Sequence, residues 1–116
     1  MKHRKKNRKF GRAADYRKRF LWNLTGNLIL KEKIKTTEAR AKEIRKVAER
    51  AITRAKNDTL ANRRLLLKFT SVKIINKLFK ELSPRFKERK GGYTRIIKMN
   101  TRKNDGAEMV LIEFVK

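Results

Sequence analysis

The sequence predicts an α+β fold in which helices come first and a β-hairpin closes the chain. Apolar side chains recur at steps of three and four residues through most of residues 13–82, which is the spacing of amphipathic helices. After residue 92, two runs rich in β-branched and aromatic residues flank a group of turn-forming residues, which is typical of a hairpin. The length of 116 residues suits one domain. We therefore expect a single α+β domain over residues 13–116, preceded by an extension over residues 1–12.

Positive charge dominates the composition. Lys and Arg number 35 against 11 Asp and Glu, a formal net charge of +24. Self-repulsion of this size opposes a compact state, so we expect an anionic partner, and nucleic acid is the obvious one. The chain has no Cys, which excludes a disulfide framework and thiolate chemistry. Its apolar runs are too short to span a membrane, and its charged start lacks the apolar core of a signal peptide, so we expect a cytosolic protein.

The extension, MKHRKKNRKFGR, is rich in Lys and Arg and has no acidic residue. It cannot bury enough apolar surface to fold alone. We interpret it as a segment that becomes ordered on phosphate groups, and the alternative is a disordered solubilising tail. His3 is the only histidine, and without a second His, a Cys or clustered carboxylates it is a poor candidate for a metal ligand or a catalytic base.

The first helix is expected over residues 13–30. Its apolar face is formed by Phe20, Leu21, Leu24 and Leu28. Gly26 lies inside this pattern and costs about 1 kcal/mol relative to Ala. Either the helix ends there or, as we favour, another backbone passes close to it. We interpret Trp22 as a packing residue, with stacking on a base as the alternative. Residues 31–35, KEKIK, are long enough for a short edge strand.

Residues 36–57, TTEARAKEIRKVAERAITRAKN, form the longest predicted helix, and we expect the rest of the chain to pack around it. Thr36 or Thr37 supplies the N-cap oxygen, and Glu38 lies in the first turn, where the helix dipole favours an anion. One shallow stripe is apolar: Ala41, Ile44, Ala48, Ala51, Ile52 and Ala55. The remaining surface is strongly basic: Arg40, Lys42, Arg45, Lys46, Arg50 and Arg54.

Two shorter helices follow. Asp58 or Thr59 can cap a helix over residues 60–69, and Thr70 or Ser71 can cap a second one that ends near Leu82. The buried stripe of the second helix is expected to comprise Val72, Ile75, Leu78, Phe79 and Leu82. A break is expected at Ser83 and Pro84, because proline cannot continue a regular helix. In the basic segment after it, we expect Phe86 to touch the core.

Gly91, Gly92 and Tyr93 open the C-terminal part. Paired glycines allow a sharp turn and a close approach of backbone amides to phosphate, while Tyr93 can stack or donate a hydrogen bond; a plain turn fits equally well. The hairpin strands are expected over residues 93–99 and 108–115. The second strand is apolar on both faces, so it should be central or covered by helices.

No catalytic constellation is present in the sequence. Glu38, Glu43 and Glu49 lie among Arg and Lys on one helix and are best explained as local ion pairs. There is no phosphate-binding Walker loop, no zinc-ligand spacing, and no Ser or Cys with a plausible histidine base. Because the positive charge is spread over every segment, we expect a protein embedded in a folded polyanion rather than one that reads duplex DNA with one face.

Three sequence blocks together resemble a known family. The opening HRK followed by RKFGR, the block KIKTTEARAKEIRKVAERAIT, and the run GGYTRIIK before an apolar terminal strand resemble the bacterial-type large-subunit ribosomal protein L-seventeen family over essentially the whole chain. The resemblance implies a helix, a strand, three helices and two strands, with a small three-stranded sheet packed on helices. It also implies that residues 33–36 form a strand. Members are non-catalytic components of the large ribosomal subunit in the cytoplasm. They bind its large RNA near the outer end of the nascent-chain exit tunnel, beside neighbouring ribosomal proteins.

The resemblance implies RNA contacts at these residues: His3, Arg4, Lys5, Lys9, Arg12, Arg40, Lys42, Arg45, Tyr93 and Arg95. We add three basic residues from the same segments: Arg8, Arg17 and Arg102. The sequence departs from the family pattern twice. Tyr16 stands where a histidine is expected, which bears on one RNA contact, and residues 103–106 read Lys-Asn-Asp-Gly, which bears on the position of the hairpin turn.

The resulting hypothesis is a structural ribosomal protein with no cofactor, no metal and no small-molecule substrate. Three alternatives stay open. A free nucleic-acid binder of the nucleoid or RNA-chaperone kind would bind DNA and RNA alike and stay off ribosomes. A basic RNA-processing enzyme would need a pair of essential carboxylates. A protein that adsorbs to anionic membranes is the weakest of the three, because the helices are needed for a core.

Overall fold

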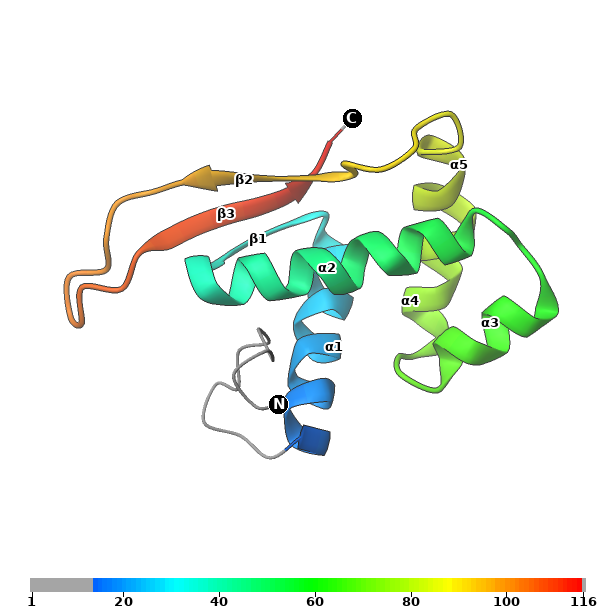
Figure 1. Ribbon diagram of the computed structural model, residues 1–116, viewed down its shortest axis with the longest axis horizontal. Helices are drawn as coiled ribbons and strands as arrows, with labels where there is room; N and C mark the ends of the chain where they lie inside the picture. Colours follow the sequence, from blue (N-terminus) through cyan, green and yellow to red (C-terminus); the bar gives the residue numbers. More distant parts are fainter. Residues whose placement is uncertain (1–13, 116) are drawn as a thin grey trace, which may run out of the picture.

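The computed structural model describes residues 14–115, which form an α+β fold (Figure 1). In chain order the elements are α1 (Ala14–Lys31), β1 (Lys33–Thr37), α2 (Glu38–Ala55), α3 (Leu60–Leu67), α4 (Val72–Lys77), the π-helical turn η2 (Leu78–Leu82), α5 (Ser83–Arg85), β2 (Thr94–Lys98) and β3 (Met109–Phe114). The predicted fold class and order of elements are confirmed. The short strand β1, which only the family resemblance made a firm expectation, is present.

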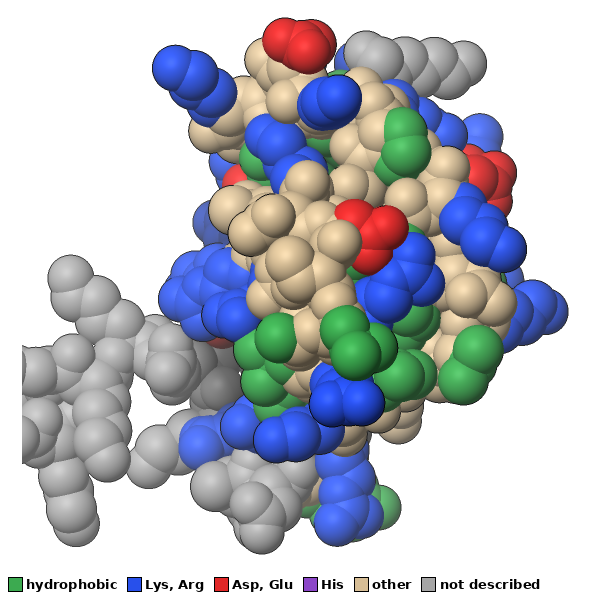
Figure 2. All heavy atoms as spheres, turned by 90° about the vertical axis from the view of Figure 1, so that its right-hand side faces the viewer, with side chains coloured by type: hydrophobic (Ala, Val, Ile, Leu, Met, Phe, Trp, Pro, Cys, Tyr) green, Lys and Arg blue, Asp and Glu red, His purple; other side chains and the backbone are tan. Residues whose placement is uncertain are grey.

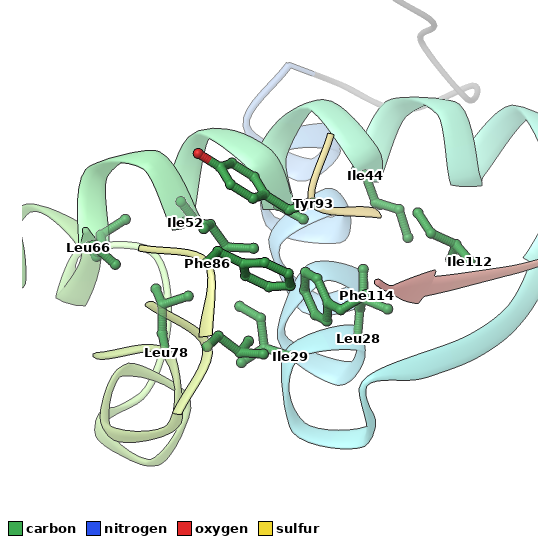
Figure 3. Close-up of a cluster of buried hydrophobic side chains, with 14 of the residues drawn as sticks. Leu28, Ile29, Ile44, Ile52, Leu66, Leu78, Phe86, Tyr93, Ile112 and Phe114 are labelled. Carbon is green, nitrogen blue, oxygen red and sulfur yellow. The ribbon is translucent and has the colours of Figure 1, made fainter. Parts of the chain in front are cut away.

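Helix α2 lies across the other helices and alongside the sheet, as expected of the central element (Figure 1). Its start is capped by Thr37, whose hydroxyl oxygen accepts a hydrogen bond from the Arg40 amide at 3.4 Å. The predicted apolar stripe is buried at every position: Ala41, Ile44, Ala48, Ala51, Ile52 and Ala55. Because alanine side chains are short, larger side chains from other elements fill the space beside them. Figure 3 shows several of these: Leu28, Ile29, Leu78, Phe86, Ile112 and Phe114.

The sheet has three antiparallel strands in the order β1-β3-β2. Strand β3 is therefore central, which confirms the prediction from its two apolar faces. Val110, Ile112 and Phe114 are buried, and the residues between them are half-buried. Ile112 is paired with Ile34 on one side and Ile96 on the other, so apolar side chains cross the sheet in one row. The far end of the hairpin extends beyond the helices (Figure 1).

Helix α1 continues through Gly26 to Lys31. A Cβ atom added at Gly26 would lie 2.6 Å from the Cδ1 atom of Ile74, which belongs to α4. The expected close approach is therefore present, but the nearest group is a side chain, and the expectation of a backbone was wrong. The close packing of α1 against α4 therefore favours a small residue at this position.

Substitutions at Gly26 should separate helix propensity from packing. We expect Gly26→Val to destabilise the protein by about 1–3 kcal/mol, because the branched side chain overfills the contact with Ile74. Gly26→Ala should be nearly neutral, since a helix-propensity gain of about 1 kcal/mol offsets the displacement of Ile74. Urea denaturation measures both. In a protein that already carries Ile74→Val, which lacks the obstructing methyl group, adding Gly26→Ala should increase stability. If Gly26→Val and Gly26→Ala were equally stable, the contact with Ile74 would not limit the size of the side chain at position 26.

The predicted break at Ser83 and Pro84 was wrong. Helix α4, η2 and α5 form one uninterrupted helical segment up to Arg85. The Ser83 amide donates to the Leu78 carbonyl, five residues earlier, so the turn before Pro84 is wider than an α-helical turn. In an α-helix the proline ring clashes with the carbonyl four residues back, and the wider turn changes where that carbonyl lies. The Ser83 hydroxyl also donates to the Ala55 carbonyl at 2.8 Å, which ties α5 to the end of α2.

Glu32 joins the end of α1 to the last helical segment. It adopts a left-handed backbone conformation with φ of 66°, a position that usually favours glycine. Its carboxylate accepts a hydrogen bond from Arg85 at 2.5 Å and lies 3.2 Å from the Nζ atom of Lys77. The hydrogen bond from Arg85, with a smaller contribution from Lys77, lowers the pKa of Glu32 to about 2. These two contacts explain why an acidic residue occupies the position.

The ion pairs of Glu32 should make stability depend on pH. The folded-state pKa is depressed, so the stabilisation is fully present above the unfolded value of 4.5 and is lost as the pH falls toward about 2. We expect Glu32→Gln to destabilise the protein by about 0.5–1 kcal/mol at neutral pH, because solvent screens this partly exposed group. The difference from wild type should shrink steadily as the pH falls from about 4.5 toward 2. Urea denaturation across this pH range tests it, with the exposed Glu88→Gln as the matched control; a difference that does not shrink on acidification would contradict the ion-pair explanation.

Candidate nucleic-acid interface

The outer face of α2 carries the predicted basic residues. Lys42, Arg45, Lys46, Arg50 and Arg54 are all exposed. Three acidic residues of the same helix lie close to some of them, in the pairs Lys42–Glu38 at 3.0 Å, Lys46–Glu43 at 3.5 Å and Arg45–Glu49 at 3.9 Å. The prediction of local ion pairs is confirmed. The cations of these pairs are about half exposed, whereas Glu43 is buried and Glu38 and Glu49 are partly buried. Because solvent screens the exposed cations, they can also turn toward phosphate groups.

Glu49 also makes a contact that its local sequence does not indicate. Its Oε2 atom accepts hydrogen bonds from the hydroxyl and the amide of Thr94, at 2.9 and 3.3 Å. These bonds attach the start of β2 to the middle of α2. They leave Arg45 only a loose contact with the same carboxylate, and Arg45 remains half exposed.

Arg40 and Arg17 are half-buried on the helices. The guanidinium of Arg40 lies 5.0 Å from the centre of the Phe20 ring, which fixes its position at the start of α2 by a cation–π contact. Arg17 lies in the second turn of α1. Among the side chains of residues 16–115, no acidic residue lies within 4.0 Å of either guanidinium.

Arg95 lies near the start of β2, and Arg102 lies in the loop between β2 and β3, which extends beyond the helices (Figure 1). Arg95 pairs with Glu113 of the neighbouring strand at 2.6 Å and is largely exposed. Arg102 pairs with Asp105 in the loop through two contacts of 2.9 and 2.6 Å. The hydrogen bond from Arg102, with help from the Ala107 amide, lowers the pKa of Asp105 to about 2, so this pair stays charged at neutral pH.

Tyr93 lies in the core, unlike the exposed ring that stacking on a base requires. It is 1% exposed, and its ring packs 5.2 Å from the ring of Phe86. Its hydroxyl accepts a hydrogen bond from the Nζ atom of Lys56 at 3.1 Å, and Lys56 also donates to the Arg89 carbonyl. Tyr93 and Lys56 together hold the turn of Gly91 and Gly92 against the end of α2. The burial of Tyr93 thus argues against stacking of its ring on a base, and the approach of the Gly91 and Gly92 amides to phosphate stays a prediction.

The remaining predicted contacts lie outside the described residues: His3, Arg4, Lys5, Arg8, Lys9 and Arg12. For the described ones, the structure places Arg40, Lys42 and Arg45 together at the start of α2 and Arg95 and Arg102 on the hairpin. It does not bring these two groups into one site. The spread agrees with charge distributed over several sides.

Sequence reasoning missed one basic cluster around the half-buried Trp22 and the exposed Phe69, formed by Lys18, Arg19, Arg50, Arg54 and Lys68. The face that carries α3 shows hydrophobic side chains exposed among Lys and Arg (Figure 2). Lys18 and Trp22, and likewise Arg50 and Arg54, are four residues apart on their helices, which was the available signal. The packing of α1, α2 and α3 against one another brings the two pairs together.

Within residues 14–115, no group of three or more His, Cys, Asp or Glu side chains lies close enough to hold a metal ion. No helix in the same part of the chain is long and apolar enough to cross a membrane.

Comparison with known proteins places the chain in a family. Residues 20–115 match the family described as Ribosomal protein L17. The chain is 53% identical over 116 residues to the large ribosomal subunit protein bL17 of Fusobacterium nucleatum subsp. nucleatum, covering 99% of this chain and 100% of that protein. It is 50% identical over 108 residues to the protein of the same name from Carboxydothermus hydrogenoformans, covering 92% of this chain and 96% of that protein. The chain therefore belongs to the ribosomal protein L17 family.

Proposed function

We propose that this protein is a structural constituent of the large ribosomal subunit, where it binds the large ribosomal RNA and stabilises its fold. The observation that carries the proposal is the match to large-subunit proteins over nearly the whole chain, combined with exposed cations on α1, α2 and the hairpin. Its role is structural and not catalytic, and its location is the cytoplasmic ribosome.

The mechanism is charge neutralisation. Exposed Lys and Arg side chains bind the phosphates of separate RNA helices and hold those helices together, so the protein reads the shape of the RNA more than its base edges. Among the residues that the structure describes, we propose six as RNA contacts: Arg17, Arg40, Lys42, Arg45, Arg95 and Arg102. We infer an indirect role for Tyr93, which positions Lys56 from within the core.

Residues 1–12 are proposed to act as an RNA-binding extension of the domain over residues 13–116. The predicted contacts of this extension are His3, Arg4, Lys5, Arg8, Lys9 and Arg12. A chain that lacks residues 2–12 should therefore enter the subunit poorly while keeping its urea denaturation midpoint. We also propose, from the family resemblance, a position near the outer end of the exit tunnel beside neighbouring ribosomal proteins, which chemical cross-linking within purified subunits tests.

Sedimentation of the tagged protein from a lysate tests the function directly. After washes at moderate and at high monovalent salt, the protein should travel with large subunits under both conditions. A binder held by about six phosphate contacts alone loses on the order of 1,000-fold in affinity between about 50 and 200 mM salt, so retention requires many simultaneous contacts within an assembled particle. If the protein stays at the top of the gradient, or follows DNA until nuclease treatment, it is a free nucleic-acid binder and the proposal is wrong.

A further inference from the structure

A hollow of about 390 Å³ lies between α1, α2 and α3, next to the basic cluster. Its walls are largely apolar and include Leu21, Trp22, Val47, Leu65 and Phe69. Three cations stand around it: Lys18, Arg50 and Arg54. The volume lies within the range of about 300–1,000 Å³ that small-ligand sites occupy, and an apolar wall with a few convergent charges is the usual composition of such sites.

An aromatic pair separates this hollow from a second one. The rings of Trp22 and Phe69 are stacked with centres 5.2 Å apart and planes inclined by 7°. Both residues, with Lys18, also line the neighbouring hollow of about 240 Å³, where Arg19 and Lys68 add two more cations. The Nζ atom of Lys18 lies 5.0 Å from the centre of the Phe69 ring. Phe69 is 36% exposed, so its ring is within reach of a ligand.

The charges around the pair indicate what kind of ligand fits. Lys18, Arg19, Arg50, Arg54 and Lys68 have no acidic partner within 4.0 Å among residues 16–115, although acids pair with many other cations of the protein. Neither hollow is lined by an acidic residue. A complementary ligand therefore combines a flat, largely apolar group with several negative charges on either side of it. An unpaired nucleotide in an RNA strand has this composition.

We propose that the hollow between α1, α2 and α3 binds one unpaired nucleotide of the RNA. The base enters the apolar hollow against Trp22 and Phe69, and the flanking phosphates bind Arg50, Arg54 and the cations of the second hollow. This proposal rests on the RNA-binding function given above and adds a specific site to it. The other possible occupant is an acidic segment of a neighbouring protein, and the experiments distinguish the two.

Trp22 is the only tryptophan of the chain, so its fluorescence reports directly on the site. A short single-stranded RNA added to the full chain should quench this fluorescence, because a base lies against the indole. Two probes of equal charge control for electrostatics: inorganic polyphosphate and a fully paired RNA duplex should both bind without quenching. If single-stranded RNA binds but leaves the fluorescence unchanged, or if polyphosphate quenches equally, the nucleotide site is excluded.

Two variants localise the effect while keeping the reporter. Phe69→Leu removes a stacking ring but keeps an apolar wall. It should weaken binding of the single-stranded RNA by about 5- to 100-fold, the range for one stacked base, and leave polyphosphate binding unchanged. Arg50→Gln with Arg54→Gln should reduce quenching more than Lys98→Gln with Lys103→Gln, a charge-matched pair on the hairpin. Unchanged urea midpoints verify that all variants fold, and equal effects of the two pairs would overturn the proposal.

Large subunits that carry Phe69→Leu provide the decisive measurement. If the site is a nucleotide site, one unpaired base of the large RNA should gain reactivity toward dimethyl sulfate, while the protein still travels with subunits in high salt. If no base changes reactivity, or a neighbouring protein is lost from the subunit instead, the hollow does not hold a nucleotide although the ribosomal function stands. If neither the variant nor the wild-type protein enters large subunits, the proposed function itself is wrong.

Discussion

Replacing Phe86 with alanine should destabilise the protein by about 3–5 kcal/mol, the range for removing a buried phenylalanine. The side chain is 2% exposed and lies where α5 meets the sheet. Its ring centre is 5.2 Å from that of Tyr93 and 6.2 Å from that of Phe114, both in tilted arrangements that favour aromatic pairs (Figure 3). Removing it therefore opens a cavity at the junction of helix and sheet.

The loss is large compared with the whole stability of a domain, which is typically about 5–15 kcal/mol and is further reduced here by a net charge of +24. Urea denaturation followed by circular dichroism measures it. Phe86→Leu is the control, because it keeps most of the volume and should cost clearly less. A loss below about 1 kcal/mol for the alanine variant would mean that the surrounding side chains close the cavity and that the aromatic junction contributes little.

Neutralising Arg40, Lys42 and Arg45 together by glutamine should weaken binding to the large ribosomal RNA by about 100-fold near physiological salt. Each phosphate contact contributes about 0.7–0.9 to the slope of log affinity against log salt, so the slope should fall by about 2–3. The fold should persist, because the pairs of Lys42 with Glu38 and of Arg45 with Glu49 are exposed and contribute little stability. Filter binding of the full chain at several salt concentrations measures both quantities.

The matched control for this triple variant keeps every charge, with Arg40→Lys, Lys42→Arg and Arg45→Lys. Its salt slope should equal that of the wild type, whereas its affinity reports how much the planar guanidinium geometry contributes. If the glutamine variant kept the wild-type slope, these three side chains would not touch phosphates. The start of α2 would then face away from the RNA.

The secondary structure was largely predictable because its signals are local. A three- or four-residue period, a threonine before an acidic first turn and a turn-forming group between apolar runs act within one element. They predicted α2, α3 and the hairpin, which are confirmed, and they left two candidates for each helix cap, of which the structure uses Thr37 and Thr59. The break at Pro84 was wrong because a π turn depends on the packing of Ser83 against Ala55, 28 residues earlier.

For the candidate site, the sequence predicted a basic, exposed surface but not which residues lie together on it. Composition indicated a polyanionic partner, and the basic residues of α2 were correctly expected to be exposed except for Arg40, which is half-buried against Phe20. Tyr93 illustrates the limit. In the sequence it follows two glycines and looks available for stacking, yet it is buried because Phe86 and Lys56 approach it from other elements. Which side of a short turn faces the core depends on distant residues.

The sequence by itself determined the order of elements, the central position of β3, the basic character of the surface and the family. The surface character and most of the elements follow from residue types and their spacing along the chain, whereas β1 and the family follow from the resemblance of three sequence blocks. Only the tertiary structure decided three contacts. Ile74 packs against Gly26, and Glu49 accepts hydrogen bonds from Thr94. Trp22 and Phe69 stack on each other with Lys and Arg side chains around them. These contacts join residues far apart in sequence, and their geometry depends on how helices with short alanine side chains approach one another.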